Sequence, residues 1–375
     1  MKKIVFITGT RADYGKIKSI MKMLQEDEDF DLQIFITGMH MLAEYGSTYK
    51  EILKDGFNNV YKYINYRSGI DMDEALSSTI KGFGDYVKEE KPDMIVVHGD
   101  RLEALAGAIV GAMNNIYIAH IEGGEKSGTI DESIRHAITK LSHVHFVANE
   151  EAKKRILQMG ENEANIYIVG SPDIDIMMHE KLPSIEKVKE KYTIPFEKYA
   201  IVMFHPVTTS HGNMADYAKT FVSALKKSGD NYVIILPNND WGRDFIIHEY
   251  KKLEEDKHFA IYPSLRFEYF LSLLKNALYI IGNSSAGVRE AGIYAIPAID
   301  VGNRQKDRYD LNCEEIINTD YNEQQILDAI ECVKNKKLNP SFVFGDGNSA
   351  QHVIDVLKKQ EFWEMEIQKK FIDAE

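Results

Sequence analysis

The chain has 375 residues, of which 44% are hydrophobic, and this length allows two globular domains with substantial cores. Its 45 basic and 58 acidic residues give a formal net charge of −13, which argues against a nucleic-acid binder because such proteins present a basic surface. Two cysteines, Cys313 and Cys332, indicate neither a disulfide framework nor a metal-ligand motif, and they suit a reducing compartment.

The N-terminus has two lysines followed by a short apolar run, a pattern that also occurs in secretory signals. This run ends after about six residues in a Gly-Thr-Arg turn, whereas a signal peptide needs about 7–15 apolar residues. Elsewhere the chain has no stretch near the roughly 18 uninterrupted apolar residues of a membrane span. We therefore expect a cytoplasmic protein with no membrane partner.

The first half of the chain alternates short apolar runs with amphipathic stretches. The apolar runs predict strands at 3–9, 32–38, 94–100, 116–122, 145–149 and 166–170. Their apolar residues are consecutive instead of alternating, which is typical of strands buried on both faces. Amphipathic segments at 15–27 and 73–91 predict helices between strands. This order predicts a parallel, doubly wound α/β sheet.

A second series of the same kind follows a charged, proline-containing segment at 181–198. Its strands are predicted at 199–206, 232–238, 259–264, 277–285, 295–302 and 315–320, and a helical pattern covers 349–371. We therefore predict an α/β protein with two doubly wound Rossmann-like domains facing a central cleft. The expected parts are 1–174 for the first domain, 175–355 for the second, and 356–375 for a C-terminal helix that packs back on the first.

Two carboxylates lie at the ends of predicted strands. Asp100 ends the strand 94–100, and Glu122 ends the strand 116–122. In open α/β sheets ligands bind at the carboxyl ends of the strands, so we expect both side chains at one crevice. For each acid a structural role stays open, because Asp at such a turn often caps the next helix. Two adjacent strands that each end in an acid favour a functional role.

A third carboxylate, Asp131, falls in the first turn of a predicted helix after the loop GGEKSG. The helix dipole favours an anion there, and Arg135, four positions on, is close enough to pair with it. For Asp131 alone a structural role is therefore the stronger interpretation. Only nearness to Asp100 and Glu122 would make it catalytic.

The second half offers a nucleotide site without a dinucleotide fingerprint. His205 lies at a predicted strand end, where a lone histidine is more often structural than catalytic. The segment IGNSSAGVREAG at 281–292 predicts a strand end, a turn of small residues and a helix start. Its backbone N–H groups and the hydroxyls of Ser284 and Ser285 could hold a phosphate, and Glu290 could accept both ribose hydroxyls. Tight packing of the turn is the alternative, and no GxGxxG supports a nicotinamide or flavin cofactor.

Several longer blocks resemble a known enzyme family. In chain order they are GTRADYGK, VVHGDRLEALA, HIEGGEKSGTIDESIRHAITKLSH, HPVTT, IGNSSAGVREAG, GNRQ and FGDGNSA. Together they resemble the hydrolysing UDP-N-acetylglucosamine 2-epimerases of sialic acid biosynthesis, and the epimerase half of the vertebrate bifunctional epimerase/kinase. The resemblance runs from residue 3 to about residue 352.

This resemblance implies a fold like that of GT-B glycosyltransferases, no cofactor and no metal, and a homodimer or homotetramer. The implied reaction converts UDP-N-acetylglucosamine (UDP-GlcNAc) and water to N-acetylmannosamine and UDP. From the net charge we expect no nucleic-acid partner. The family's catalytic groups fall on Asp100, Glu122, Asp131 and His205. Its nucleotide contacts fall on Arg11, Arg101, Asn238, Ser284, Ser285, Glu290 and Arg304.

The chemistry explains why these residue types are needed. One carboxylate removes the hydrogen at C2 while UDP leaves from C1, and another group directs water and a proton to the resulting 2-acetamidoglucal. We assign Asp100 as the base, with Glu122 and Asp131 handling water and proton return. Clustered carboxylates raise one another's pKa, so one can hold a proton while another is ionised. Arg11, Arg101, His205 and the Ser284–Ser285 turn are expected to supply cations and N–H donors to the diphosphate.

Four alternatives stay open at this point. The enzyme could be a non-hydrolysing epimerase that keeps the nucleotide on the sugar, or a hydrolysing epimerase of a UDP- or GDP-linked 2,4-diacetamido sugar. A glycosyltransferase of the same fold would fit the nucleotide turn but gives no reason for three clustered acids. A nucleotide-sugar sensor without turnover would not need to keep the acids and the histidine.

Overall fold

The structure is a computed structural model, and it describes residues 1–43, 46–65, 70–126, 130–179, 181–207, 213–237, 242–305, 308–309, 313–334 and 336–373. The chain divides into two compact units. Unit 1 comprises Met1–His179 and Val343–Glu375, and unit 2 comprises Glu180–Phe342.

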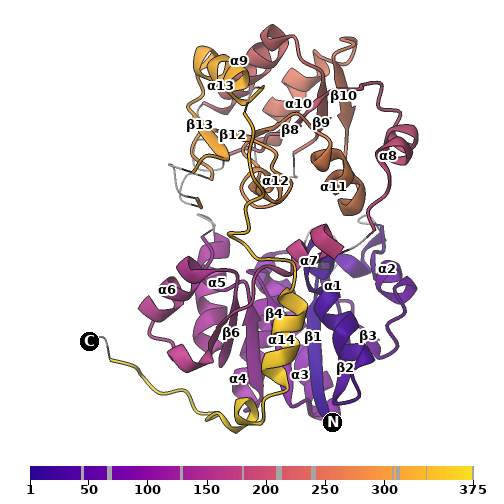
Figure 1. Ribbon diagram of the computed structural model, residues 1–375. Helices are drawn as coiled ribbons and strands as arrows, with labels where there is room; N and C mark the ends of the chain where they lie inside the picture. The colour runs from indigo at the N-terminus through magenta and orange to yellow at the C-terminus, as the bar shows by residue number, and fades with distance from the viewer. Residues whose placement is uncertain are drawn as a thin grey trace. The chain divides into compact units, whose positions relative to one another are not determined.

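The described residues of unit 1 form a seven-stranded parallel sheet in the order β3-β2-β1-β4-β5-β6-β7 (Figure 1). Chain order reverses between β1 and β4, the point at which open α/β sheets bind ligands. The strands are β1 (Lys2–Thr8), β2 (Phe30–Ile36), β3 (Val60–Lys62), β4 (Met94–His98), β5 (Tyr117–Ile121), β6 (Val144–Val147) and β7 (Ile166–Ile168).

Helices cover both faces of this sheet, because successive strand side chains point to opposite faces. Ile4 and Phe6 of β1 pack with α1 and α14, whereas Val5 and Ile7 pack with α3, α4 and α5. This two-sided burial explains the consecutive apolar runs in the sequence. The helices are α1 (Arg11–Glu26), α2 (Tyr49–Lys54), α3 (Met72–Glu90), α4 (Leu102–Met113), α5 (Ile130–Leu141), α6 (Glu150–Gln158), α7 (Pro172–His179) and α14 (Ser349–Leu357).

In unit 2 the described residues form a six-stranded parallel sheet in the order β10-β9-β8-β11-β12-β13. Here the reversal falls between β8 and β11, and α9, α10 and α13 pack on one face. The strands are β8 (Ala200–Met203), β9 (Tyr232–Ile235), β10 (Phe259–Tyr262), β11 (Ile280–Gly282), β12 (Ala298–Val301) and β13 (Ile316–Thr319). The helices are α8 (Ile185–Tyr192), α9 (Met214–Ser228), α10 (Arg243–Lys251), α11 (Phe267–Lys275), α12 (Glu290–Ile293) and α13 (Glu323–Lys334).

The C-terminal segment belongs to unit 1, where α14 packs against α1 and α7 (Figure 1). The helix ends at Leu357 and is followed by the 3-10 helix η5 (Gln360–Glu364). Trp363 Nε1 donates to the Leu357 carbonyl at 2.8 Å, so the indole satisfies one of the helix's free C-terminal acceptors. The helical pattern over 349–371 therefore forms an α-helix only over Ser349–Leu357.

The predicted α/β class and every predicted strand are confirmed. The short strand β3 was not predicted, because its three residues include an exposed Tyr61 and make no apolar run. The residues at which the chain crosses between the two units differ from the expected domain boundaries. Unit 1 continues through α7 to His179, and residues 343–355 join unit 1 because Asp175 accepts the N–H groups of Ser349 and Ala350 at 2.8 and 2.7 Å.

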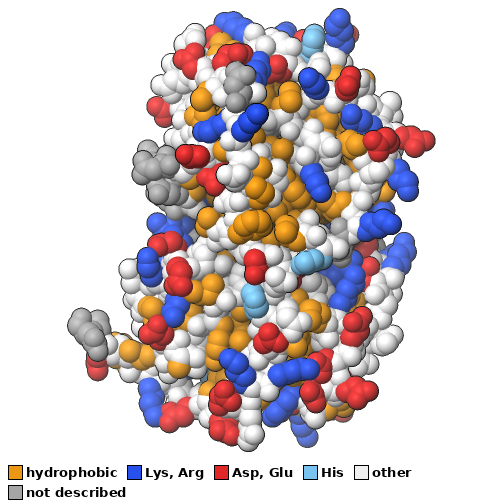
Figure 2. Space-filling model, in the orientation of Figure 1, with side chains coloured by type: hydrophobic (Ala, Val, Ile, Leu, Met, Phe, Trp, Pro, Cys, Tyr) orange, Lys and Arg blue, Asp and Glu red, His pale blue; other side chains and the backbone are white. Residues whose placement is uncertain are grey.

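Surface charge on each unit is mixed. Basic and acidic side chains are interspersed on the face of each unit that Figure 2 shows. Among the residues that the structure describes, no helix is long and apolar enough to cross a bilayer.

Candidate active site

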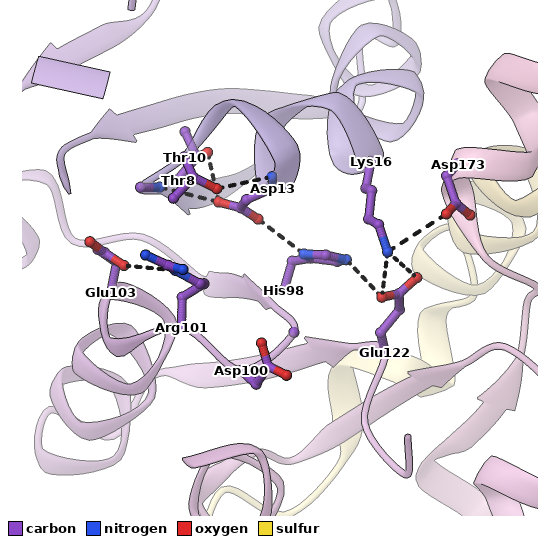
Figure 3. Close-up of polar contacts among 12 residues, drawn as sticks. Thr8, Thr10, Asp13, Lys16, His98, Asp100, Arg101, Glu103, Glu122 and Asp173 are labelled. Atoms are coloured by element: carbon purple, nitrogen blue, oxygen red, sulfur yellow. Dashed lines mark hydrogen bonds and ion pairs between the residues drawn. The ribbon is translucent and has the colours of Figure 1, made fainter. Parts of the chain in front are cut away.

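The carboxyl ends of β1, β4 and β5 bring together charged side chains that are far apart in the sequence (Figure 3). β1 ends at Thr8 and β4 at His98, and Glu122 directly follows β5. These ends are neighbours because β4 pairs with both β1 and β5. They lie at the reversal of strand order, where a ligand is expected.

Asp13 connects the end of β1 to the end of β4. It lies in the first turn of α1 and is buried. Its Oδ2 accepts hydrogen bonds from the Thr8 hydroxyl at 2.7 Å and the Gly9 N–H at 3.2 Å, and its Oδ1 lies 3.0 Å from His98 Nδ1. Asp13 therefore fixes the orientation of the His98 ring.

His98 lies between two carboxylates, with Nε2 3.3 Å from Glu122 Oε2 on the side opposite Asp13. Burial by itself would lower the pKa of His98. The negative charges of Glu122 and Asp13 and their hydrogen bonds outweigh burial and raise this pKa to about 9. The ring is therefore an imidazolium at neutral pH, and both of its nitrogens are donors.

Glu122 is buried and is also contacted by Lys16 and Ser171. Lys16 Nζ of α1 lies 3.3 and 3.1 Å from its two oxygens, and Ser171 Oγ donates to Oε1 at 2.5 Å. Lys16 also lies 3.6 Å from Asp173 (Figure 3). The φ angle of Glu122 is 62°, in the left-handed region that costs a non-glycine residue about 1–2 kcal/mol. Such a conformation persists where surrounding contacts over-determine it, as they do here.

Asp100 lies in the turn that follows β4. The N–H of Gly99 donates to the Ile121 carbonyl at 2.9 Å, which joins this turn to the residue before Glu122. His120 Nε2 lies 2.8 Å from the Gly99 carbonyl. Burial lowers the pKa of His120 to about 3, so the ring is neutral and donates its Nε2 proton to this carbonyl.

Arg135 of α5 links the helix that carries Asp131 to the turn that carries Asp100. Its Nη2 makes an ion pair with Asp100 Oδ2, and its Nη1 donates to the Glu125 carbonyl at 3.0 Å. Asp131 lies one turn earlier on the same helix. The three predicted acids thus belong to one region of unit 1, and two of them have a defined cationic neighbour.

Arg11 and Arg101 lie at the starts of α1 and α4. Arg11 pairs with Glu51 at 2.9 Å, and Arg101 Nε is 4.0 Å from the buried Glu103. Their side chains are 45% and 43% exposed, so both guanidinium groups are accessible to a ligand.

In unit 2 the residues after β8 and β11 are joined by Asn283. Its Oδ1 accepts the N–H of His205 at 2.7 Å, and its Nδ2 donates to the His205 carbonyl at 2.9 Å. Burial, with the charge of Arg304, lowers the pKa of His205 to about 4. His205 is therefore neutral at neutral pH and can supply an N–H donor.

Of the other predicted nucleotide residues, Arg304 contacts the same asparagine and Ser284 follows it directly in the chain. Arg304 Nη1 donates to the Asn283 carbonyl at 2.9 Å. Ser284 Oγ accepts the Ala286 N–H at 3.3 Å and caps the 3-10 helix η4 (Ser285–Gly287). Glu290 is the first residue of α12. Asn238 lies outside the described residues.

Sequence reasoning did not single out the residues that hold the predicted ones in place. These are Asp13, Lys16, His98, Ser171 and Asn283. Asp13, His98 and Asn283 lie at a strand end or in a first helical turn, and that position was the available signal. Lys16, in the second turn of α1, and Ser171, between β7 and α7, carry no such signal. Their contacts join segments up to 106 positions apart, as in the Lys16 to Glu122 bond, so spacing could not reveal them.

Two Rossmann-like units of this kind make the protein GT-B-like in fold. Residues 22–358 match the family model described as UDP-N-acetylglucosamine 2-epimerase. The chain belongs to this UDP-N-acetylglucosamine 2-epimerase family.

Three relatives match most or all of the chain. A UDP-N-acetylglucosamine 2-epimerase of Neisseria meningitidis is 48% identical, covering 100% of this chain and 99% of its own. A hydrolysing UDP-N,N'-diacetylbacillosamine 2-epimerase of Legionella pneumophila is 34% identical, covering 96% of each. The polysialic acid biosynthesis protein P7 of Escherichia coli is 35% identical, covering 82% of this chain and 80% of its own.

A solved structure supports the fold. The Neisseria meningitidis UDP-GlcNAc 2-epimerase bound to UDP-GlcNAc superposes with a TM-score of 0.80 at 18% identity, covering 95% of this chain and 99% of that one. At this identity the likeness establishes the fold alone.

Proposed function

We propose that the protein is a hydrolysing UDP-GlcNAc 2-epimerase, which converts UDP-GlcNAc and water to N-acetylmannosamine and UDP as the first step of sialic acid biosynthesis. Two relatives support the substrate and the pathway: the Neisseria epimerase at 48% identity and the E. coli protein named for polysialic acid biosynthesis. A third relative, the Legionella epimerase, is named as hydrolysing.

The observation that carries the proposal is the set of acids at the carboxyl end of the unit 1 sheet. Asp100 and Glu122 follow neighbouring strands, and Arg135 ties Asp100 to the helix that begins with Asp131. Elimination and hydration at adjacent sugar carbons need more than one positioned proton-transfer group. A binding module or a glycosyltransferase has no use for three.

In the proposed mechanism Asp100 removes the proton from C2. The C2–H electron pair forms the C1–C2 double bond of 2-acetamidoglucal, and the C1–O bond breaks to release UDP. Glu122 and Asp131 then direct water to C1 and a proton to the opposite face of C2. The product is N-acetylmannosamine, and the proton taken from C2 is returned to solvent.

On the nucleotide side, the proposed contacts to UDP are Arg11, Arg101, Asn238, Ser284, Ser285, Glu290 and Arg304, with His205 as a neutral N–H donor. Arginines suit the diphosphate because their planar, permanently charged groups bind phosphate oxygens in pairs. Preorganised donors stabilise the charge that develops on the leaving group.

The deciding experiment is proton NMR of the protein with UDP-GlcNAc in deuterated water. We expect free UDP together with N-acetylmannosamine that carries deuterium at C2, because the C2 proton exchanges with solvent between elimination and hydration. The variant Asp100→Asn, purified in parallel, is the control and is expected to form neither product. UDP-N-acetylmannosamine as the product would instead show a non-hydrolysing epimerase.

One alternative substrate has a specific observation in its favour. The Legionella relative is named for a UDP-linked N,N'-diacetylbacillosamine. The same NMR assay with UDP-diacetamido and GDP-diacetamido sugars tests this alternative. Turnover of such a sugar at least tenfold faster than UDP-GlcNAc would assign the protein to that substrate class.

A further inference from the structure

Ser171 contacts both Glu122 and the segment through which the chain returns to unit 1. The chain leaves unit 1 after His179 and re-enters it at Val343. Ser171 lies shortly before the point at which the chain leaves unit 1, and it is completely buried. Its hydroxyl donates to Glu122 Oε1 at 2.5 Å, and its backbone N–H donates to the Phe344 carbonyl at 2.6 Å.

Residues 170–175 pack closely against residues 344–350, and we call these two stretches the crossing segments. Their packing fixes the position of Ser171. A Cβ atom on Gly170 would lie 2.8 Å from Ser349 Oγ and 3.0 Å from Gly345 Cα, so only glycine fits there. Asp175 accepts the N–H groups of Ser349 and Ala350 and so caps α14. The serine hydroxyl is therefore held at a defined point.

Two further groups that contact Glu122 come from elements outside these segments. His98 of β4 lies 3.3 Å from Oε2, and Lys16 of α1 reaches both oxygens. Beyond them lie two further carboxylates, Asp13 next to His98 and Asp173 next to Lys16. Of the contacts to Glu122, the Ser171 hydroxyl is the one supplied by the crossing segments, and at 2.5 Å it is shorter than the 3.3 Å contact of Lys16 Nζ with the same oxygen.

We propose that Ser171 is a positioning residue for the reaction. The crossing segments hold its hydroxyl in place, and the hydroxyl orients the Glu122 carboxylate and favours its ionised form. This inference rests on the proposed function, in which Glu122 directs water and returns a proton. Ser171 acts through Glu122 and need not touch the substrate.

The sign of the pH effect follows from the hydrogen bond. A donor to the ionised form of a carboxyl stabilises that form, and its removal raises the carboxyl pKa. The variant Ser171→Ala should therefore lose activity at a higher pH than the wild type as the solution is acidified. A change in packing alone would not move this acidic limb.

The experiment compares kcat, KM and the pH profile of kcat for the wild type and three variants, with calorimetric affinity for UDP measured on each. We expect Ser171→Ala to lower kcat about 10- to 100-fold, the range for a lost hydrogen bond to a charged group, with UDP affinity unchanged. Its acidic limb should move up by about one pH unit. Ser171→Cys, which keeps the size and a weak donor, should fall between the two.

The matched control is Ser142→Ala. Ser142 is also completely buried in unit 1, and its hydroxyl donates to the Ile138 carbonyl at 2.8 Å, away from Glu122. This variant should lose a similar amount of stability in urea but keep the kcat and the acidic limb of the wild type.

The outcomes separate this inference from the proposed function. If the wild type gives no N-acetylmannosamine, the proposed function and this inference both fail. If the wild type is active and both Ser171 variants keep its acidic limb, Ser171 does not act through Glu122, whatever their stability. If Ser142→Ala shifts the limb equally, the effect is general and the positioning role is wrong.

Discussion

Three histidines, two in unit 1 and one in unit 2, illustrate how single residues obtain their protonation states. His98 and His120 lie on neighbouring parallel strands, and both are buried. His98 faces two carboxylates and its pKa rises to about 9, whereas His120 faces a carbonyl and a hydroxyl and its pKa falls to about 3. Burial disfavours the charged form in both, so the neighbouring charges decide the outcome. His205 follows the second pattern.

A pH dependence of stability follows for His98. Its pKa in the folded protein, about 9, lies above its ordinary value of 6.5. The stabilisation is therefore complete below about pH 6.5 and is lost as the pH rises through 9, with a maximum of about 3 kcal/mol. In urea unfolding, the difference in free energy between the wild type and His98→Gln should shrink by that order between pH 6.5 and pH 10.

The matched control is His120→Gln. His120 is already neutral over this whole range, so its difference from the wild type should stay constant. A constant difference for His98→Gln as well would show that His98 is not an imidazolium between Asp13 and Glu122.

At the scale of elements, the segment after α14 fixes the C-terminal end of the helix that carries Asp131. Lys369 Nζ donates to the carbonyls of Lys140 and Ser142 at 2.9 and 2.5 Å, where α5 ends, and pairs with Glu161 at 2.5 Å. A cation at this end complements the helix dipole and satisfies free carbonyls. The segment 358–373 therefore stabilises the C-terminal end of α5 through Lys369.

We predict that Lys369→Met lowers the free energy of unfolding by about 2 kcal/mol, because it removes charged hydrogen bonds to partly buried acceptors. Urea denaturation measures the change. Lys370→Met is the matched control, since Lys370 is 72% exposed and pairs with Glu366 on the surface; it should change stability by less than about 0.5 kcal/mol. Equal effects of the two variants would show that Lys369 does not stabilise the end of α5.

At the scale of the whole molecule, the two units differ in how the chain builds them. Unit 2 is one continuous segment with its own core, whereas unit 1 needs residues from both ends of the chain. Val353, Ile354 and Leu357 of α14 are buried in the unit 1 core. Burial of such side chains contributes about 1.5–3 kcal/mol each, a large part of a typical domain stability of about 5–15 kcal/mol.

This asymmetry predicts different behaviour of fragments. Residues 180–342 expressed alone should unfold in one cooperative urea transition followed by circular dichroism. Residues 1–179 alone should show none, and fusion to residues 343–373 through a short Gly-Ser linker should restore it. Cooperative unfolding of 1–179 without α14 would show that the C-terminal segment is dispensable for the unit 1 core.

The sequence by itself determined the buried strands of this protein and the edges of the sheets on which its predicted acids lie. Consecutive apolar runs mark strands buried on both faces, and an alternation with helices permits essentially one arrangement, a parallel sheet. Asp100, Glu122 and His205 could be located at strand ends for the same reason. These patterns involve residues close together in the chain, so they can be recognised from the sequence alone.

Tertiary structure alone decided the partners and the charges. The bonds of Glu122 to Lys16 and Ser171 span 106 and 49 positions, and no periodicity relates such residues. The charge of His98 depends on two carboxylates brought in by different elements, and the end of α14 depends on Trp363 folding back onto it. Such contacts arise from packing of segments distant in the chain, so the protonation states they set can be derived only from the fold.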